Sequence, residues 1–269
     1  MSTFLHGANL RANGIRQHYL RYGGRGRPVV IVPGITSPAV TWGFVAERFG
    51  RHFDTYVLDV RGRGLSAASD ALDYGLDALA ADANAFAEAL GLEGYALVGH
   101  SMGARVGIRA ARQQPRGLER LVLIDPPVSG PGRRAYPAKL DWYVDSIRLM
   151  RDGAGMEALR PFSPTWTDDQ LRLRAEWLHT CDERAIVTTY EGFHQDDIHA
   201  DLPRIKVPTL LIAAGRGDVI RPQDLAELRE LLPAMQITTV AGAGHMIPWD
   251  DEAGFYKAFG DFLGTPIVD

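Results

Sequence analysis

The chain has 269 residues, 46% of them hydrophobic and 23% charged, which is the composition of a folded globular protein. Its formal net charge of −4 argues against nucleic acid or an anionic membrane as a partner. The single cysteine, Cys181, excludes an internal disulfide and a cysteine-based metal site. The apolar runs are too short to span a bilayer, and the N-terminal segment lacks the core of a signal peptide. We therefore expect a soluble cytoplasmic protein.

Short apolar runs recur along the chain, and each ends at a glycine or a turn. They are QHYLRYG, PVVIVPG, FDTYVLDVRG, YALVGHS, RLVLIDPP, PTLLIAAG and MQITTVAGAGH. Helical patterns lie between them, such as the segment that stops at Gly91 and the one with Pro222 in its first turn. Because strands and helices alternate, the sequence predicts an α/β fold with a mostly parallel sheet of about eight strands flanked by helices.

The alternation is interrupted once, between residues 128 and 202, where helical patterns occur without a strand. One of them begins with Thr167 and Gln170 at the spacing of a capping box. We interpret residues 128–202 as a helical cap inserted over the sheet edge, with residues 1–127 and 203–269 forming the core. The alternative is a set of additional helices packed elsewhere, with their aromatic residues as an internal core.

The segment LVGHSMGARVG contains Ser101 at the spacing G-x-S-x-G, between a predicted strand and a predicted helix. This arrangement is typical of a serine nucleophile on a sharp turn, where the flanking glycines relieve crowding. The alternative is an ordinary glycine turn whose serine only caps the helix. The chain context favours the nucleophile.

A serine nucleophile needs a base and a group that orients the base. His245 follows the last predicted strand on a glycine-rich loop, which is the place expected for the base. Two aspartates follow strands that should be neighbours: Asp125 in LVLIDPP and Asp218 in GRGD. From the residues alone, either acid can reach His245.

The oxyanion that forms during acyl transfer needs two backbone N–H donors. One is expected from Met102, the residue after the nucleophile, and the other from Ile35 in the loop VPGITSP. The alternative for this loop is a plain turn.

The motifs PGITSPAVTWG, DVRGRGLS, GHSMGAR, LVLIDPP, GRGD and GAGHMIPWDD resemble, in this order, those of the α/β-hydrolase superfamily. DPPVSGPGRRAYPAKL, RAEWLHTC and GHMIPWDD also resemble the N-formylmaleamate deformylases of bacterial nicotinic acid breakdown. That resemblance implies a triad of Ser101, Asp125 and His245. The wider superfamily usually places the acid later in the chain, which would select Asp218.

The narrower resemblance implies hydrolysis of N-formylmaleamate to maleamate and formate, with no metal and no organic cofactor. Such an anionic small-molecule substrate should meet a cation, for which Arg133 and Arg134 are the candidates. Trp142, Tyr143 and Trp177 are candidates for the pocket wall. These five side chains have surface or packing roles as their alternatives.

Two other functions remain open at this point. One is a hydrolase of C–C bonds, or a carboxylesterase, acting on an intermediate of aromatic catabolism. The other is a ligand-binding receptor on a hydrolase fold, which the complete set of serine, histidine and acid disfavours. No feature of the sequence points to an interface between subunits.

Overall fold

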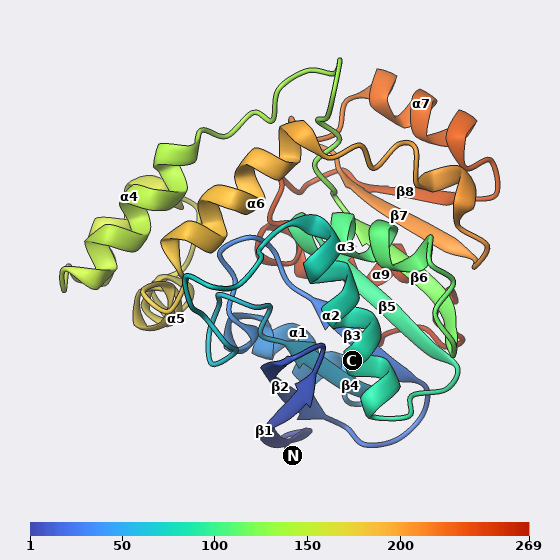
Figure 1. Cartoon of the computed structure of the whole chain (residues 1–269), viewed down its shortest axis with the longest axis horizontal. Helices are drawn as coiled ribbons and strands as arrows, with labels where there is room; N and C mark the ends of the chain where they lie inside the picture. The colour runs from blue at the N-terminus through green and yellow to red at the C-terminus, as the bar shows by residue number, and fades with distance from the viewer. Residues whose placement is uncertain (269) are drawn as a thin grey trace.

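The computed structural model describes residues 1–268, in which eight strands form one sheet (Figure 1). The strands are β1 (Phe4–Ala12), β2 (Ile15–Tyr22), β3 (Pro28–Val32), β4 (Asp54–Leu58), β5 (Tyr95–His100), β6 (Leu118–Ile124), β7 (Thr209–Ala214) and β8 (Gln236–Val240). The α-helices are α1 (Gly43–Phe49), α2 (Leu76–Ala89), α3 (Met102–Ala111), α4 (Leu140–Arg151), α5 (Asp168–Leu178), α6 (Glu183–Gln195), α7 (Pro222–Leu231), α8 (Ile247–Asp250) and α9 (Glu252–Phe259). Three short 3-10 helices are η1 (Ala39–Trp42), η2 (Met156–Phe162) and η3 (Leu202–Arg204).

The strand order across the sheet is β1-β2-β4-β3-β5-β6-β7-β8. Strand β2 is antiparallel to both of its neighbours, and the strands from β4 to β8 in this order are parallel. The predicted fold class, an α/β fold with a mostly parallel sheet flanked by helices, is thereby confirmed. Because the carboxyl ends of parallel strands meet at one edge, the loops after β3, β5, β6, β7 and β8 lie close together.

The N-terminal strand β1 was not among the predicted strands. Its side chains are mostly exposed, so it lacks the apolar run that identified the others. It forms a hairpin with β2 through Asn13 and Gly14, both of which have positive φ (49° and 73°). An Asn-Gly pair is the preferred sequence for such a two-residue turn, and it is the signal that would have predicted this strand.

The two faces of the sheet pack against different helices, and alternate residues of each strand face opposite layers. In β3, Val29 and Ile31 belong to the core shared with α1 and α9, whereas Val30 and Val32 belong to the core shared with α2 and α3. These four valine and isoleucine side chains are at most 1% exposed. The continuous apolar runs in the sequence therefore reflect burial on both faces.

Helices α4, α5 and α6 come between β6 and β7 in the chain and lie together to one side of the strands (Figure 1). Helix α5 begins at the predicted capping box, in which Thr167 accepts a bond from the Gln170 N–H and Gln170 from the Thr167 N–H. Apolar side chains of these helices, including Tyr143 and Leu171, join the core on the α2–α3 face. Within residues 1–268, no helix is long and apolar enough to cross a membrane.

Candidate active site

Ser101 lies on a sharp turn between β5 and α3, with a φ of 52° and a ψ of −116°. A positive φ is unfavourable for a residue with a side chain, so the surrounding packing must hold the turn. The two glycines of the motif allow this packing. A Cβ on Gly99 would overlap the Gly103 carbonyl, and a Cβ on Gly103 would overlap the Val32 carbonyl of β3. The motif therefore brings the start of α3 against two strands.

We expect Gly103→Ala to destabilise the protein by more than about 3 kcal/mol, because the added methyl group would displace backbone rather than a flexible side chain. Urea denaturation followed by circular dichroism would measure this change. Gly107→Ala on the same helix is the matched control. Its Cβ would lie 3.0 Å from Leu121 Cδ1, the end of a movable side chain. Equal stability of the two variants would contradict this account of the turn.

His245 connects the serine to an acid. Its Nε2 lies 3.0 Å from Ser101 Oγ, and its Nδ1 lies 2.7 Å from Asp125 Oδ2. The other carboxylate oxygen of Asp125 accepts a bond from the Ala214 N–H at 3.2 Å. The Asp125 side chain is 1% exposed and that of His245 is 23% exposed. The arrangement therefore has the contacts of a nucleophile, a base and a buried orienting acid.

Asp218, the other acid that the sequence allowed, has a different partner. Its carboxylate accepts two bonds from the Arg221 guanidinium, at 2.7 and 2.9 Å, and its side chain is 56% exposed. It lines the cavity described below, but the structure brings Asp125 rather than Asp218 to His245. The bond with Arg221 also lowers the pKa of Asp218, so this carboxylate stays charged at neutral pH.

The two expected oxyanion donors occupy the ends of neighbouring elements. Met102 is the first residue of α3, and its side chain is buried in the core, so only its backbone faces the turn. Ile35 follows β3 in a loop that Arg63 holds, because Arg63 Nε donates to the Ile35 carbonyl at 3.0 Å. Both Ile35 and Ser101 line the same cavity. The role of these two backbone N–H groups as oxyanion donors stays a prediction.

His100, which precedes the serine, is fully buried beneath the turn. Its ring lies against that of His245, with centroids 5.1 Å apart, and its Nε2 donates to the His245 carbonyl at 3.0 Å. Burial, with a smaller contribution from His245, lowers the pKa of His100 to about 3. The His100 imidazole is therefore neutral at physiological pH. It supports the loop of His245 and does not compete with His245 for the proton of Ser101.

A cavity of about 440 Å³ opens beside Ser101 and His245. Its wall comes from the loop after β3, from the segment that contains α4, η2 and α5, and from the loops after β7 and β8. Trp142 and Tyr143, two of the expected wall residues, line it, whereas Trp177 does not. Tyr136 also lines it; its hydroxyl lies 3.0 Å from that of Tyr143.

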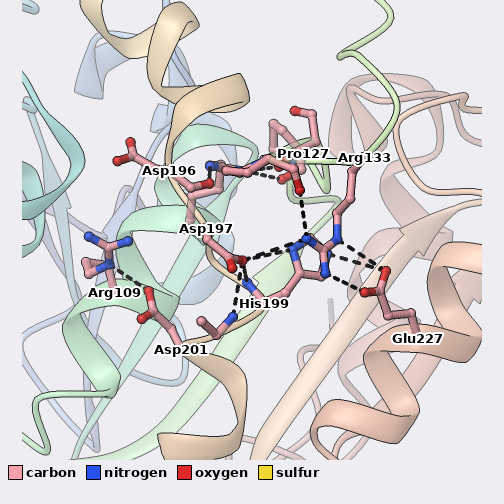
Figure 2. Close-up of polar contacts among 12 residues, drawn as sticks. Arg109, Pro127, Arg133, Asp196, Asp197, His199, Asp201 and Glu227 are labelled. Atoms are coloured by element: carbon pink, nitrogen blue, oxygen red, sulfur yellow. Dashed lines mark hydrogen bonds and ion pairs between the residues drawn. The ribbon is translucent and has the colours of Figure 1, made fainter.

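Arg133 and Arg134 were expected to meet the substrate carboxylate, and the structure corrects this expectation. Neither side chain lines the cavity. Arg133 forms an ion pair with Glu227 of α7 at 2.5 Å, and Figure 2 shows its guanidinium turned toward that carboxylate beside His199. Arg134 pairs with Asp224 of the same helix at 2.7 Å. Their charges are neutralised there, so the two arginines hold the segment after β6 against α7.

Two other cations, which were not expected there from the sequence, line the cavity: Arg174 of α5 and Arg216 after β7. Arg174 shares the buried face of its helix with Leu171 and Leu178, at the spacing of one helical face. An arginine on the apolar face of an amphipathic helix is the signal that would have identified it, because arginine is seldom fully buried without a partner.

Similarity to known proteins shows to which class this protein belongs. The family described as alpha/beta hydrolase fold matches residues 27–252, and the chain belongs to this family. It is 65% identical over 268 residues, all of both chains, to the N-formylmaleamate deformylase of Pseudomonas putida. The crystal structure of the N-formylmaleamic acid deformylase from Pseudomonas putida S16 matches with a TM-score of 0.91 at 55% identity, covering 94% of this chain and 99% of that one. At 22% identity, an E-2-(acetamidomethylene)succinate hydrolase shares the fold, with a TM-score of 0.79 over 97% of this chain and all of that one.

Proposed function

We propose that this protein is an N-formylmaleamate deformylase: a serine hydrolase that cleaves a C–N bond and converts N-formylmaleamate and water to maleamate and formate. The observation that carries the proposal is the 65% identity to a deformylase over the whole length of both chains. The contacts among Ser101, His245 and Asp125 supply the machinery for acyl transfer that this reaction requires.

In the first step, Ser101 Oγ attacks the formyl carbon of the substrate while His245 Nε2 accepts the hydroxyl proton. Asp125 holds the imidazole by its Nδ1 and stabilises the imidazolium that forms. The tetrahedral oxyanion accepts bonds from the backbone N–H groups of Met102 and Ile35. Each such donor typically lowers the barrier by about 3 kcal/mol.

In the second step, the C–N bond of the tetrahedral intermediate breaks, and His245 gives its proton to the departing nitrogen. Maleamate leaves, and a formyl ester remains on Ser101. The departing nitrogen remains bonded to the maleamate carbonyl, which delocalises the negative charge that develops on it. It therefore leaves more readily than the nitrogen of a simple amine. A water molecule, deprotonated by His245, then attacks the formyl ester. The bond from the formyl carbon to Ser101 Oγ breaks, His245 returns the proton to Oγ, and formate is released.

We also propose which segments form the cap and the core, and in which compartment the protein works. Residues 128–202 act as the cap of the site, because Trp142 and Tyr143 from this segment line the cavity that also contains Ser101. Residues 1–127 and 203–269 form the catalytic core, with residue 269 outside the part of the chain that the structure describes. The anionic substrate is a small metabolite, and the free, buried Cys181 is compatible with the reducing cytoplasm that the sequence suggests.

The test is a turnover assay with purified protein and N-formylmaleamate, in which formate, formamide, maleamate and maleate are quantified by proton NMR. Formate and maleamate in equal amounts are expected. Formamide and maleate would mean attack on the other carbonyl. A panel of p-nitrophenyl esters and a ring-fission dienone serves as the comparison. Rapid dienone cleavage without formate would replace the deformylase with a C–C hydrolase, and no turnover of any compound would favour a receptor.

A further inference from the structure

Arg174 is a buried cation in the wall of the catalytic cavity. It projects from α5, is 5% exposed, and lines the cavity together with Ser101. Its Nη1 donates to the Thr36 carbonyl at 3.3 Å and its Nη2 to the Thr36 hydroxyl at 3.0 Å. Its buried Nε has no hydrogen-bond partner. The guanidinium therefore retains bonding capacity that the described residues do not use.

The charge of Arg174 also lacks a neutralising carboxylate. Within residues 1–268, the ionisable groups that act on it are the Cys181 thiol and the Tyr143 hydroxyl, which are neutral at pH 7. Desolvation by burial lowers the pKa of Arg174. By contrast, the buried guanidiniums of Arg61 and Arg109 have aspartate partners at 2.5 and 2.6 Å. A buried charge without a partner is unfavourable, and an anionic ligand that pairs with it removes this cost.

Other buried arginines without a carboxylate bond use their donors within the protein. Arg105 donates to four backbone carbonyls, and Arg63 donates to three backbone carbonyls and to the Thr189 hydroxyl. Neither of them lines the catalytic cavity. Arg174 thus differs from them both in its unused donor and in its access to the site.

Two tryptophans of the cavity wall accompany the guanidinium. The Arg174 Cζ lies 6.0 Å from the centroid of the Trp142 ring and 5.6 Å from that of Trp166. Trp166 is itself stacked on Trp249, with centroids 5.4 Å apart. These rings restrict the movement of the guanidinium and shield it from solvent. A charge-assisted bond made here is stronger than one made in water.

We propose that Arg174 is the carboxylate-binding residue of this cavity and that the site selects small acyl compounds carrying a carboxylate. The choice of N-formylmaleamate as the ligand rests on the proposed function. Thr36 adjoins Ile35, so the bonds from Arg174 to Thr36 place the cation next to the loop expected to hold the oxyanion. The substrate carboxylate is only a few bonds from its formyl carbon, so both ends of the substrate are held in one cavity.

Arg216 is the competing cation, and its position is less suited to this role. It is exposed, and its Nε donates to the Gly242 carbonyl at 2.5 Å. Solvent and salt screen an exposed charge, so a carboxylate gains less there than beside buried Arg174. Arg216 lies with Asp218 on the loop after β7, and that carboxylate repels an anion.

The first test separates binding of the carboxylate from support of the fold. kcat and KM are measured for N-formylmaleamate and for N-formylacetamide, which has the same formyl imide but no carboxylate. Arg174→Met should lower kcat/KM for N-formylmaleamate by about 100-fold. For N-formylacetamide the loss should be at least about tenfold smaller, because the variant loses its bonds to Thr36 with both compounds but a salt bridge only with N-formylmaleamate. Arg174→Lys keeps the charge but loses the planar guanidinium that can bind a carboxylate through two donors. Its loss of kcat/KM for N-formylmaleamate should be intermediate.

The matched control is Arg172→Met on the same helix, whose arginine is exposed and pairs with Asp169. It should behave as the wild type with both compounds. Arg216→Gln tests the competing cation. If Arg174→Met lowers kcat/KM equally for both compounds, the proposal is overturned, and Arg174 only supports the Thr36 loop. A selective loss in Arg216→Gln instead of Arg174→Met would also overturn it.

A second test does not depend on turnover. Titration calorimetry with maleamate, an anion, and maleamide, its neutral counterpart, should show preferential binding of maleamate to the wild type. Arg174→Met should abolish that preference, and Arg172→Met should retain it. If the wild type releases no formate but the preference depends on Arg174, the deformylase proposal fails and the carboxylate site stands. A preference that is absent, or that survives in Arg174→Met, overturns the site.

Discussion

Replacing Ser101 with alanine is expected to lower kcat for N-formylmaleamate by about six orders of magnitude. The hydroxyl 3.0 Å from His245 Nε2 is the proposed nucleophile, and alanine cannot form the formyl ester. The remaining oxyanion donors and the cavity leave only a small residual activity. Formate release under saturating substrate, followed over days for the variant, measures the change.

The fold should be unaffected by this substitution. The Ser101 side chain makes no cap bond to α3, and the positive φ is supported by the contacts of Gly99 and Gly103 rather than by the hydroxyl. Thermal denaturation of the variant should therefore match that of the wild type, and maleamate should still bind. A folded Ser101→Ala protein with full deformylase activity would remove Ser101 from the mechanism.

Asp125→Asn is expected to lower kcat by about four orders of magnitude. An asparagine amide facing His245 would donate a hydrogen bond to Nδ1, which forces the ring proton onto Nε2. That tautomer cannot accept the Ser101 proton. Because Asp125 and asparagine are nearly the same size, the change acts mainly on the position of a proton. Single-turnover kinetics at pH 7.5 would measure the loss.

Asp218→Asn is the matched control, since it makes the same chemical change in the other aspartate that the sequence allowed. Its carboxylate bonds Arg221 in solvent and has no bond with His245, so kcat should stay within about threefold of the wild type. Small and equal losses in the two variants would mean that neither aspartate orients the histidine. A large loss only in Asp218→Asn would reverse the assignment.

The parts of this protein that are local in sequence were predictable from the sequence. Burial on both faces leaves continuous apolar runs, so the central strands were identified. The turn at Ser101 depends on its close neighbours in the chain, Gly99 and Gly103. The start of α5 likewise depends on Thr167 and Gln170, which lie within one helical turn of each other. The fold class and the placing of Ser101 and His245 at one sheet edge followed from these local patterns.

The choice of partner for a charged side chain was decided only by the tertiary structure. Asp125 and Asp218 follow adjacent strands, and the paths of their loops bring Asp125 to His245 and leave Asp218 with Arg221. An anionic substrate needs a cation, which makes Arg133 a candidate from the sequence, but no sequence pattern shows that Glu227 lies beside it. The sequence determined which residues carry the chemistry of acyl transfer. The packing of distant segments determined which charges are neutralised within the protein and which, such as Arg174, remain available to a ligand.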